Sequence, residues 1–478
     1  MKIAVIGAGI VGLATAAGFA DLGHEVCCYD IDKEKLERIA AGQLPYLEPG
    51  LAELTKRGQE TGHLRFGSGS LPLPGDAQVV FIAVGTPAGD DGEMRLTQLW
   101  DAVERLDAWP AGSRTVIAIK STVPVGTAER LEARLRARLP AGCAVDVASA
   151  PEFMREGFAV QDFGAPTRIV IGSASPEAAE TLERLHAGLS APIVHTDRRS
   201  AELAKLAANA ALAIKISYAN EMAALAEQTG ADYPDIARIL GLDPRIGPDC
   251  LGAGLGYGGS CLPKDTRALV RLASEAGAPQ TLAAAAVRAN AALPLRMARK
   301  LESALGGLSR RRVALLGLAF KPGTADLREA PSLRLVAVLK KRYPGIALTA
   351  YDPAAEGGAM KRQLPPGLAL CATAEEALRG ADAAIVVTEW PAFRKISAED
   401  YKSWMTRPII LDGRNCLDAD ALNADGVVCI GVGRLPCAPA VSPMTPVPHD
   451  ASVPSEPLEP VISTGMTYFR DEDRELYG

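Results

Sequence analysis

The segment from Gly256 to Asp265, which reads GYGGSCLPKD, places one cysteine, Cys261, in a glycine-rich loop. Thiolate is the reactive form of cysteine, and cationic or dipolar neighbours make it available near neutral pH. Lys264 and a helix start predicted near Pro263 would supply such neighbours. Cys261 is therefore a candidate covalent nucleophile, and the alternative is a small buried apolar residue.

A second motif, GAGIVG, matches GxGxxG between an apolar run at residues 2–6 and a helix-forming segment. Its glycines let the backbone turn tightly and approach a pyrophosphate, whose charge then lies at a helix N-terminus. Asp30 follows eighteen positions after the last glycine, where it would bond the ribose hydroxyls and repel a 2′-phosphate. The pattern predicts a site that favours NAD over NADP, with FAD as a competitor. The expected contacts are Gly7, Gly9, Ile10, Val11, Gly12 and Asp30.

The segment 200–230 has alanine and leucine at helical spacing and contains no proline. It carries Lys205 and Asn209 at i and i+4, which places them on one face of the predicted helix. A lysine facing a buried site could stabilise an oxyanion or move a proton, and the asparagine could hold a water. A solvated lysine on the outer face is the alternative, and position alone leaves both open.

Strand-like runs alternate with helical or loop segments in two cycles, which indicates parallel, doubly wound sheets. The first cycle has runs at residues 2–6, 24–30, 79–84, 115–119, 145–149 and 168–171. The second has runs at 312–316, 347–351, 384–388 and 408–411. A Tyr-Asp pair closes the second run of both cycles, at Tyr29-Asp30 and Tyr351-Asp352. Further helical sequence is expected from residue 265 to about residue 305.

We therefore expect an α/β protein with two Rossmann-like domains joined by a long central helix and a helical middle. The expected parts are an NAD-binding domain at 1–197, a helical dimerisation domain at 198–300 and a second Rossmann-like domain at 301–434, which the family resemblance given below makes the nucleotide-sugar-binding domain. A proline-rich segment at 435–478 is predicted to be a flexible tail.

Composition excludes several classes of protein. A net charge of -6 gives no general attraction to nucleic acid or to an anionic membrane. The nine cysteines show neither CxxC nor Cys/His spacing, so we expect no metal site and reduced thiols in a cytoplasmic protein. We expect no signal peptide, because the N-terminus starts directly as a strand. The most apolar long stretch is interrupted by Arg288, Asn290 and Pro294, which argues against a membrane span.

From Met1 to about Arg434 the chain resembles the nucleotide-sugar 6-dehydrogenases. The resemblance is carried by blocks in matching order and approximate spacing. These blocks are GAGIVGL, VGTP, STVPVGT, APEFMREG, AELAKLAANA, DPRIG, GYGGSCLPKD, GLAFKPGTADLREAPS and DGRN.

The resemblance implies specific roles for residues at matching positions. Cys261 would be the nucleophile, Lys205 the stabiliser of the charged oxygen, and Glu152 an acid or base. Asn209, Asp265 and Thr122 would hold or activate a water. The implied NAD contacts beyond the fingerprint are Lys35, Thr86, Thr122, Glu156, Lys264 and Arg328. The implied substrate contacts are Glu152, Phe153, Lys205, Asn209, Tyr257, Gly258, Phe320, Lys321 and Arg414, with Arg245 reaching into the neighbouring subunit's site.

The implied reaction is the NAD-dependent oxidation of the C6 alcohol of UDP-glucose to UDP-glucuronate through a thiohemiacetal and a thioester on the cysteine. A homodimer or higher homo-oligomer is the implied assembly. Leu262, Ala150 and Ala325 depart from the usual family pattern, which leaves GDP-mannose or a UDP-N-acetylhexosamine as alternative substrates. A single-step β-hydroxyacid dehydrogenase and a catalytically silent nucleotide-sugar sensor rank lower, because neither needs the cysteine, lysine and aspartate together.

Overall fold

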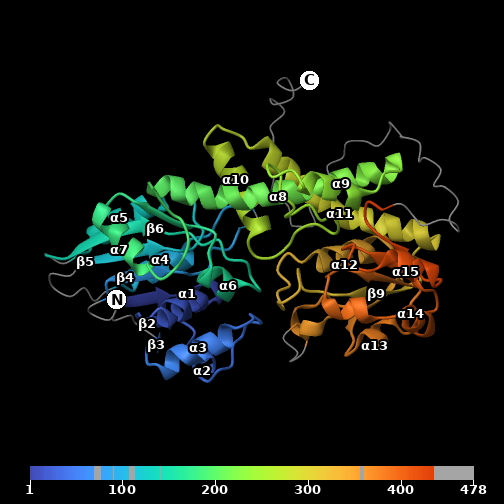
Figure 1. Ribbon diagram of the computed structural model, residues 1–478, viewed down its shortest axis with the longest axis horizontal. Coiled ribbons are helices and arrows are strands. Elements are labelled where there is room, and N and C mark those ends of the chain that lie inside the picture. Colours follow the sequence, from blue (N-terminus) through green and yellow to red (C-terminus); the bar gives the residue numbers. More distant parts are fainter. Residues whose placement is uncertain (69–76, 90, 107–113, 140–141, 356–359, 435–478) are drawn as a thin grey trace.

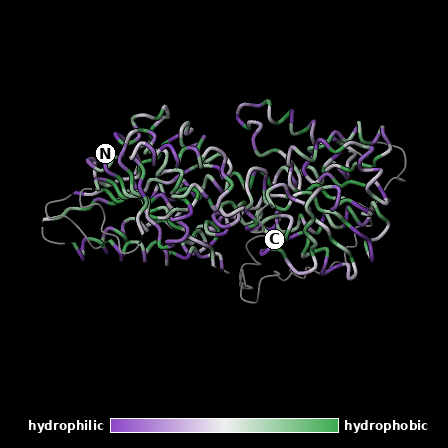
Figure 2. The backbone as a smooth tube through the Cα atoms, turned by 90° about the horizontal axis from the view of Figure 1, so that it is seen from below, coloured by the Kyte–Doolittle hydropathy of each residue, from purple (hydrophilic) through white to green (hydrophobic). Residues whose placement is uncertain are grey.

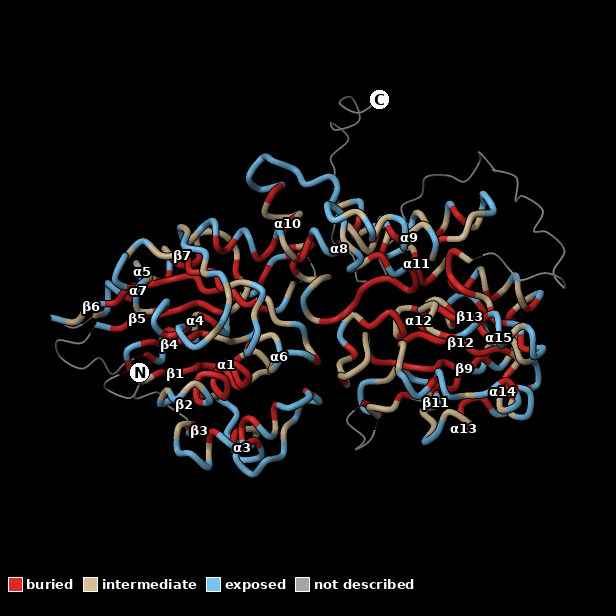
Figure 3. Tube along the Cα trace, in the orientation of Figure 1, coloured by how far each residue is buried: buried red, intermediate tan, exposed pale blue. Residues whose placement is uncertain are grey.

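The computed structural model describes residues 1–68, 77–89, 91–106, 114–139, 142–355 and 360–434. The expected tail at 435–478 lies outside these residues. Two α/β halves lie side by side, and one long helix runs across both of them (Figure 1). Buried residues follow the strands of both halves, whereas exposed residues gather on loops and outer helices (Figure 3).

The N-terminal half is built on an eight-stranded sheet with the order β3-β2-β1-β4-β5-β6-β7-β8. Its strands are β1 (Lys2–Ile6), β2 (Glu25–Asp30), β3 (Leu64–Ser68), β4 (Val79–Ile82), β5 (Arg114–Ile119), β6 (Ala144–Ser149), β7 (Ile169–Ser173) and β8 (Ile193–Thr196). Its helices are α1 (Ile10–Asp21), α2 (Lys33–Ala40), α3 (Leu51–Glu60), α4 (Thr97–Glu104), α5 (Thr127–Arg136), α6 (Ala159–Gly164) and α7 (Pro176–Leu185). The sheet is parallel except at one pair, because β7 runs antiparallel to β6.

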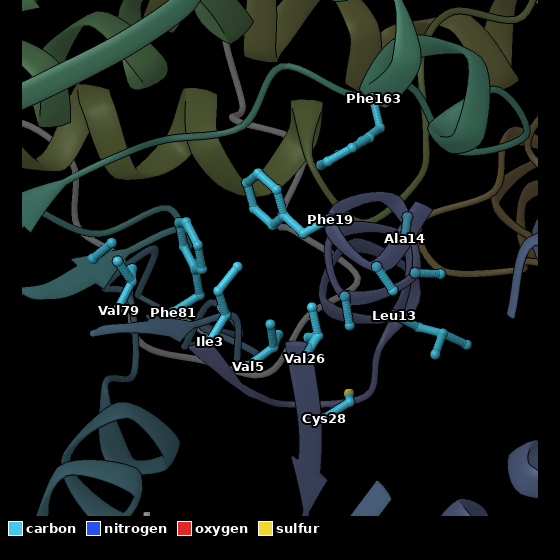
Figure 4. Packing of buried hydrophobic residues seen from close by; sticks show 14 of the residues in the cluster. Ile3, Val5, Leu13, Ala14, Phe19, Val26, Cys28, Val79, Phe81 and Phe163 are labelled. Carbon is cyan, nitrogen blue, oxygen red and sulfur yellow. The ribbon is translucent and has the colours of Figure 1, made fainter. Parts of the chain in front are cut away.

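Helices cover both faces of this sheet, so its central strands are apolar on both sides. Ile3 and Val5 of β1 face a cluster that includes α1, whereas Ala4 and Ile6 face the cluster of α4 and α5. In the first cluster the Phe19 and Phe81 rings stack with centroids 5.3 Å apart (Figure 4). The apolar strands lie in the interior of the half (Figure 2).

The middle of the chain is helical. It contains α8 (Arg198–Thr229), α9 (Tyr233–Gly241), α10 (Leu262–Glu275) and α11 (Thr281–Leu305). The helical sequence expected from residue 265 to about residue 305 forms two helices, α10 and α11, which separate where Gly277 adopts a left-handed φ of 70° and Pro279 follows. Within the described part of the chain, none of the helices has the length and apolar character that crossing a bilayer requires.

The C-terminal half repeats the design of the first with a six-stranded sheet in the order β11-β10-β9-β12-β13-β14. Its strands are β9 (Arg312–Leu316), β10 (Ala347–Tyr351), β11 (Leu368–Leu370), β12 (Ala383–Val386), β13 (Ile409–Asp412) and β14 (Val428–Ile430). Its helices are α12 (Pro331–Arg342), α13 (Ala374–Leu378), α14 (Ala398–Trp404) and α15 (Ala419–Ala424).

The repeat extends to individual hydrogen bonds. The Gly7 amide donates to the Tyr29 carbonyl at 2.7 Å, and the Gly317 amide donates to the Tyr351 carbonyl at 2.8 Å. The carboxylates of Asp30 and Asp352 then accept from backbone amides of the turn after β1 and β9. The predicted class, with two Rossmann-like α/β parts and a helical middle, is confirmed.

Candidate active site

The GAGIVG turn has the close approaches that a dinucleotide fingerprint needs. A Cβ on Gly7, whose φ is 104°, would lie 2.5 Å from the Ala83 carbonyl oxygen. A Cβ on Gly12 would lie 1.8 Å from the Gly7 carbonyl oxygen. Because α1 begins at Ile10, the amides of its first turn have no partner within the helix and suit a pyrophosphate. These residues fit NAD, with Gly9 as the N-cap and Val11 in the first turn.

Asp30 ends β2 beside this turn. Its Oδ2 accepts from the Ala8 amide at 2.8 Å and lies 2.5 Å from Lys35 Nζ. The structure therefore brings together the predicted ribose contact and the predicted basic neighbour.

The loops after β4 and β5 meet at the same edge of the sheet. The Thr86 hydroxyl donates to the Thr122 carbonyl at 2.8 Å, so the VGTP and STVPVGT blocks are in contact. Thr122 and Lys205 also line one small cavity. The predicted cofactor contact, the predicted water-holding residue and the predicted oxyanion stabiliser therefore lie in one region.

A buried polar network lies where α8 passes this edge. Lys205 is 4% exposed, and its Nζ lies 3.2 Å from Glu152 Oε1. The amide of Asn209 donates to Asp265 Oδ2 at 2.5 Å, and Lys264 Nζ donates to Asp265 Oδ1 at 2.5 Å. The solvated alternative for Lys205 is thereby excluded. Burial lowers the pKa of Lys205. The charges of Glu152, Cys261 and Asp265 raise this pKa by more than burial lowers it, so its net shift is upward.

Cys261 is the N-cap of α10 and is exposed at the surface of the site. Its sulfur lies 3.5 Å from the Ser260 hydroxyl. Surrounding protein, followed by the Asp265 and Glu152 carboxylates, raises the pKa of the thiol, whereas Lys205 and the Ser260 hydroxyl lower it. The expectation that neighbouring groups produce a net lowering of this pKa is wrong for this arrangement, because the carboxylates oppose the lysine. Burial and the two carboxylates thus oppose formation of the thiolate, so a base must take the thiol proton when the sulfur attacks.

The cysteine loop packs against the C-terminal half. A Cβ on Gly258 would lie 2.4 Å from the Glu329 carbonyl oxygen, and one on Gly259 would lie 2.8 Å from the Phe320 ring. The Tyr257 carbonyl accepts from Arg334 at 2.8 Å. Tyr257 lies in this loop and Phe320 packs against it, so the structure brings two of the predicted substrate contacts together.

Two further predicted substrate contacts lie on the same side. Arg414 donates through NH1 to the Gly256 carbonyl at 3.1 Å and through Nε to the Val387 carbonyl at 2.7 Å. Lys321 Nζ lies over the rings of Phe320 and Phe158, 5.5 and 5.6 Å from their centroids. Arg414 joins the cysteine loop to the second sheet, and Lys321 faces both halves.

The segment after Glu152 connects the two halves directly. Phe153 lies between Lys205 Nζ, 5.2 Å from its ring centroid, and the Arg168 guanidinium at 3.7 Å. Glu156 accepts from the Thr324 hydroxyl at 2.6 Å and lies 3.8 Å from Arg328. Burial raises the pKa of Glu156, which the Thr324 hydrogen bond opposes. The predicted contacts Glu156 and Arg328 therefore lie together at the junction.

Arg245 is a predicted site residue that lies apart from the other predicted site residues of the chain. Its guanidinium donates to Asp243 Oδ2 at 2.5 Å, and its side chain is 87% exposed.

Lys120 is a neighbour of the site that motif reasoning misses. It follows β5 directly before STVPVGT, is 8% exposed, and its Nζ lies 5.7 Å from the centroid of the Phe81 ring. Burial lowers the pKa of Lys120 to about 8, with Lys205 acting in the same direction and Glu152 opposing. Its position at the carboxyl end of a central strand is the signal that could have identified it.

Lys120→Met is expected to stabilise the folded chain relative to the parent, and this advantage should shrink as pH rises. The pKa of Lys120 is lower in the folded chain than in the unfolded chain. Above about pH 8 the unfolded parent therefore binds more protons than the folded parent, and the stability of the parent rises with pH. From about pH 7 to about pH 10 the difference should fall by roughly 2 to 3 kcal/mol. Urea unfolding followed by fluorescence measures it, with the exposed Lys56→Met as control; a pH-independent difference would contradict the burial of a charged Lys120.

The fold and the site together define a dehydrogenase with a dinucleotide-binding half, a second nucleotide-binding half and a helical middle that carries the polar network. Models of the UDP-glucose/GDP-mannose dehydrogenase family match its NAD binding domain at residues 1–190, its central domain at 199–292 and its UDP binding domain at 314–419. The chain belongs to this family and is an NAD-dependent dehydrogenase.

Individual relatives cover nearly the whole chain. It is 41% identical to UDP-glucose 6-dehydrogenase YwqF of Bacillus subtilis, over 92% of this chain and 99% of that protein. It is 43% identical to UDP-glucose 6-dehydrogenase of Pseudomonas aeruginosa, over 91% of this chain and 98% of that protein. The solved UDP-glucose dehydrogenase of Pyrobaculum islandicum is 36% identical with a TM-score of 0.84, over 91% of this chain and 98% of that chain. The UDP-D-ManNAc dehydrogenase of Pyrococcus horikoshii is 30% identical with a TM-score of 0.79, over 91% of this chain and 99% of that chain.

Proposed function

We propose that this dehydrogenase oxidises the C6 alcohol of UDP-glucose to the carboxylate of UDP-glucuronate in two successive oxidations at one site. The observation that carries the proposal is the buried network of Lys205, Glu152, Asn209 and Asp265 beside a cysteine at a helix start. The relatives at 41% and 43% identity that act on UDP-glucose support the choice of sugar. Residues 1–197, 198–300 and 301–434 would act as cofactor, helical and nucleotide-sugar domains.

In the first oxidation Glu152 accepts the hydroxyl proton, directly or through a water, while Lys205 stabilises the developing alkoxide. NAD, when bound at the fingerprint, would supply the hydride acceptor for each oxidation, so two NAD molecules would be used in turn. The product is an aldehyde that stays in the site. The 3.2 Å separation of Lys205 Nζ and Glu152 Oε1 lets one charge pair serve both tasks.

The Cys261 sulfur then bonds to the aldehyde carbon, and the thiol proton passes, through a base or a water, to the aldehyde oxygen, which forms a thiohemiacetal. Loss of a second hydride from that carbon, with loss of the hydroxyl proton, leaves a thioester. A water attacks the thioester, the carbon–sulfur bond breaks, and the carboxylate leaves as the thiol regains a proton. Asp265, held by Asn209 and Lys264, would orient that water together with Thr122.

The nucleotide would lie between the halves, close to cationic side chains of the C-terminal half. Lys321, Arg414 and, from a second subunit, Arg245 would neutralise the diphosphate. Tyr257, Gly258 and Phe320 would form an apolar wall for the base or sugar. These groups come from separate segments of the helical middle and the C-terminal half, which explains why the substrate needs the complete fold.

The substrate is identified by the amount of NADH formed per sugar. UDP-glucose, GDP-mannose and UDP-N-acetylmannosamine are each supplied in limiting amount, and NADH is read by absorbance. Two NADH per UDP-glucose, and slow or absent turnover of the others, is the expected result. Two NADH with UDP-N-acetylmannosamine alone would identify the second candidate, which the Pyrococcus horikoshii neighbour favours. One NADH per sugar would exclude the two-step reaction.

We also propose a homodimer whose contact includes the outer faces of α8 and α9. Tyr218 and Leu225 of α8 are 48% and 52% exposed, and Ile239 and Leu242 at α9 are 63% and 75% exposed. Such apolar groups on neighbouring helices indicate a protein contact. Arg245 lies in the loop after α9, where it would enter the partner's site.

Leu225→Glu is expected to halve the particle mass of a dimer, because it places a charge in an apolar contact. Light scattering after size-exclusion chromatography measures the mass. Val194→Glu on the edge strand β8, where Val194 is 46% exposed, is the matched control and should leave the mass unchanged. An unchanged mass for Leu225→Glu would move the contact elsewhere.

A further inference from the structure

A buried carboxylate lies one helical turn before Lys205 on the same helix. Glu202 of α8 is 3% exposed, and its spacing of three residues from Lys205 places both on one face. The mechanism above uses Lys205 and gives Glu202 no chemical role. Burying a carboxylate is costly unless hydrogen bonds satisfy it, so its partners indicate its purpose.

Those partners come from two segments that hold other site residues. Glu202 Oε2 accepts from the Gly126 amide at 2.6 Å, and Oε1 accepts from the Ala128 amide at 2.9 Å. The Ser149 hydroxyl donates to Oε1 at 3.2 Å. Gly126 is the N-cap of α5 and offers no side chain of its own. Glu202 therefore caps α5 from a different helix.

Three segments that carry functional residues meet at the Glu202 carboxylate. The loop that ends at Gly126 carries Thr122, and the strand that ends at Ser149 leads directly to Glu152. The helix that bears Glu202 carries Lys205 one turn further on. Thr122, Ser149, Glu202 and Lys205 also line one cavity of about 10 Å³, which is roughly the space that one water occupies.

We propose that Glu202 is a positioning residue that holds Lys205 in register with Thr122 and Glu152. The proposal rests on the proposed function of Lys205 and deepens it. The two carboxylate oxygens act only as acceptors, and all three partners are donors. An amide in the same place would turn one acceptor into a donor that faces a backbone N–H. Glu202→Gln is therefore the sharpest change, because it keeps the size of the side chain.

Activity is the first test, measured by steady-state kinetics with the full-length protein and saturating UDP-glucose. Glu202→Gln is expected to lower kcat by roughly tenfold to a hundredfold, since small misplacements of reacting groups have effects of this size. The KM for NAD should change less than kcat, because the fingerprint glycines and Asp30 lie on other loops than Thr122. Glu202→Asp, which keeps the charge but is shorter, should recover part of kcat.

Asp146→Asn is the matched control. Asp146 is a buried carboxylate on β6, the strand that ends at Ser149, but it pairs with Arg114 at 2.9 Å near the opposite end of that strand. It should lose thermal stability without losing kcat. Equal losses of kcat in Glu202→Gln and Asp146→Asn at equal folded fraction would overturn the proposal, as would a parental kcat in Glu202→Gln.

A second readout needs no substrate and separates this proposal from the proposed function. Lys205 lowers the pKa of the Cys261 thiol, so a displaced Lys205 should move the pH profile of Cys261 alkylation by iodoacetamide to higher pH in Glu202→Gln. Peptide mass spectrometry identifies the modified cysteine. If the parent reduces no NAD with any nucleotide sugar, the proposed function fails while this shift still tests Glu202. An unshifted pH profile of Cys261 alkylation in Glu202→Gln would overturn the positioning role. If Glu202→Gln misfolds, a Glu202→Asp protein with the parental kcat and the parental alkylation profile would overturn it as well.

Discussion

A Cys261→Ser protein is expected to lose at least about a thousandfold in kcat for NADH formation, with its affinity for NAD unchanged. A serine hydroxyl stays protonated near neutral pH and adds poorly to an aldehyde, so the thioester route closes. The NAD fingerprint lies on the loop after β1, whereas Cys261 caps α10. The substitution should therefore lower kcat and leave the affinity for NAD unchanged.

Two measurements check this result. Stopped-flow absorbance gives NADH formation, and acid quenching of the parent during turnover, followed by peptide mass spectrometry, tests for an acyl group on Cys261. Cys371→Ser, a half-buried cysteine in the second half, is the control and should keep parental turnover. Parental kcat in Cys261→Ser, or no acyl adduct in the parent, would reject covalent catalysis.

Local sequence pattern is sufficient where a residue's role depends on its own strand or turn. Asp30 and Asp352 each end the second strand of a cycle, and each accepts an amide from the preceding glycine turn. The long helix is also predictable, because the segment 200–230 contains neither proline nor an early glycine. Its buried face carries Lys205 and Asn209 as the helical spacing indicates.

Pattern fails where the partner is distant in sequence or the element is short. The edge strand β8 has four residues, IVHT, with a polar half that no alternation distinguishes from a loop. The antiparallel pairing of β7 depends on a neighbouring strand rather than on its own residues. The pKa of Cys261 depends on Glu152, more than a hundred residues earlier, which opposes the effect of the lysine.

The same limit applies to the buried charges around Lys205. Glu202 bonds amides more than seventy positions away, and Lys120 meets Glu152 and Lys205 only in the folded chain. Helical spacing identifies the face of Lys205 but not what covers it. The network that makes it a site therefore follows from the packing of α8 on the first sheet.

Lys205→Met is expected to lower kcat by about a hundredfold to a thousandfold, because a preorganised cation at a developing oxyanion contributes roughly 3 to 4 kcal/mol. Stability should fall as well, since Glu152 would remain buried without the cation 3.2 Å away. Removing one partner of a buried pair typically costs about 3 to 5 kcal/mol. Thermal unfolding and steady-state kinetics measure the two losses separately.

A double variant separates the effect on stability from the effect on kcat. Lys205→Met with Glu152→Gln should regain much of the lost stability, because no unpaired charge remains, while activity stays low. Lys300→Met is the matched control, since Lys300 Nζ of α11 lies 2.5 Å from Glu227 Oε1, near the far end of α8, in a partly buried pair. It should lose stability and keep kcat. If Lys205→Met loses kcat only to the extent that Lys300→Met does, Lys205 stabilises the fold and not the oxyanion.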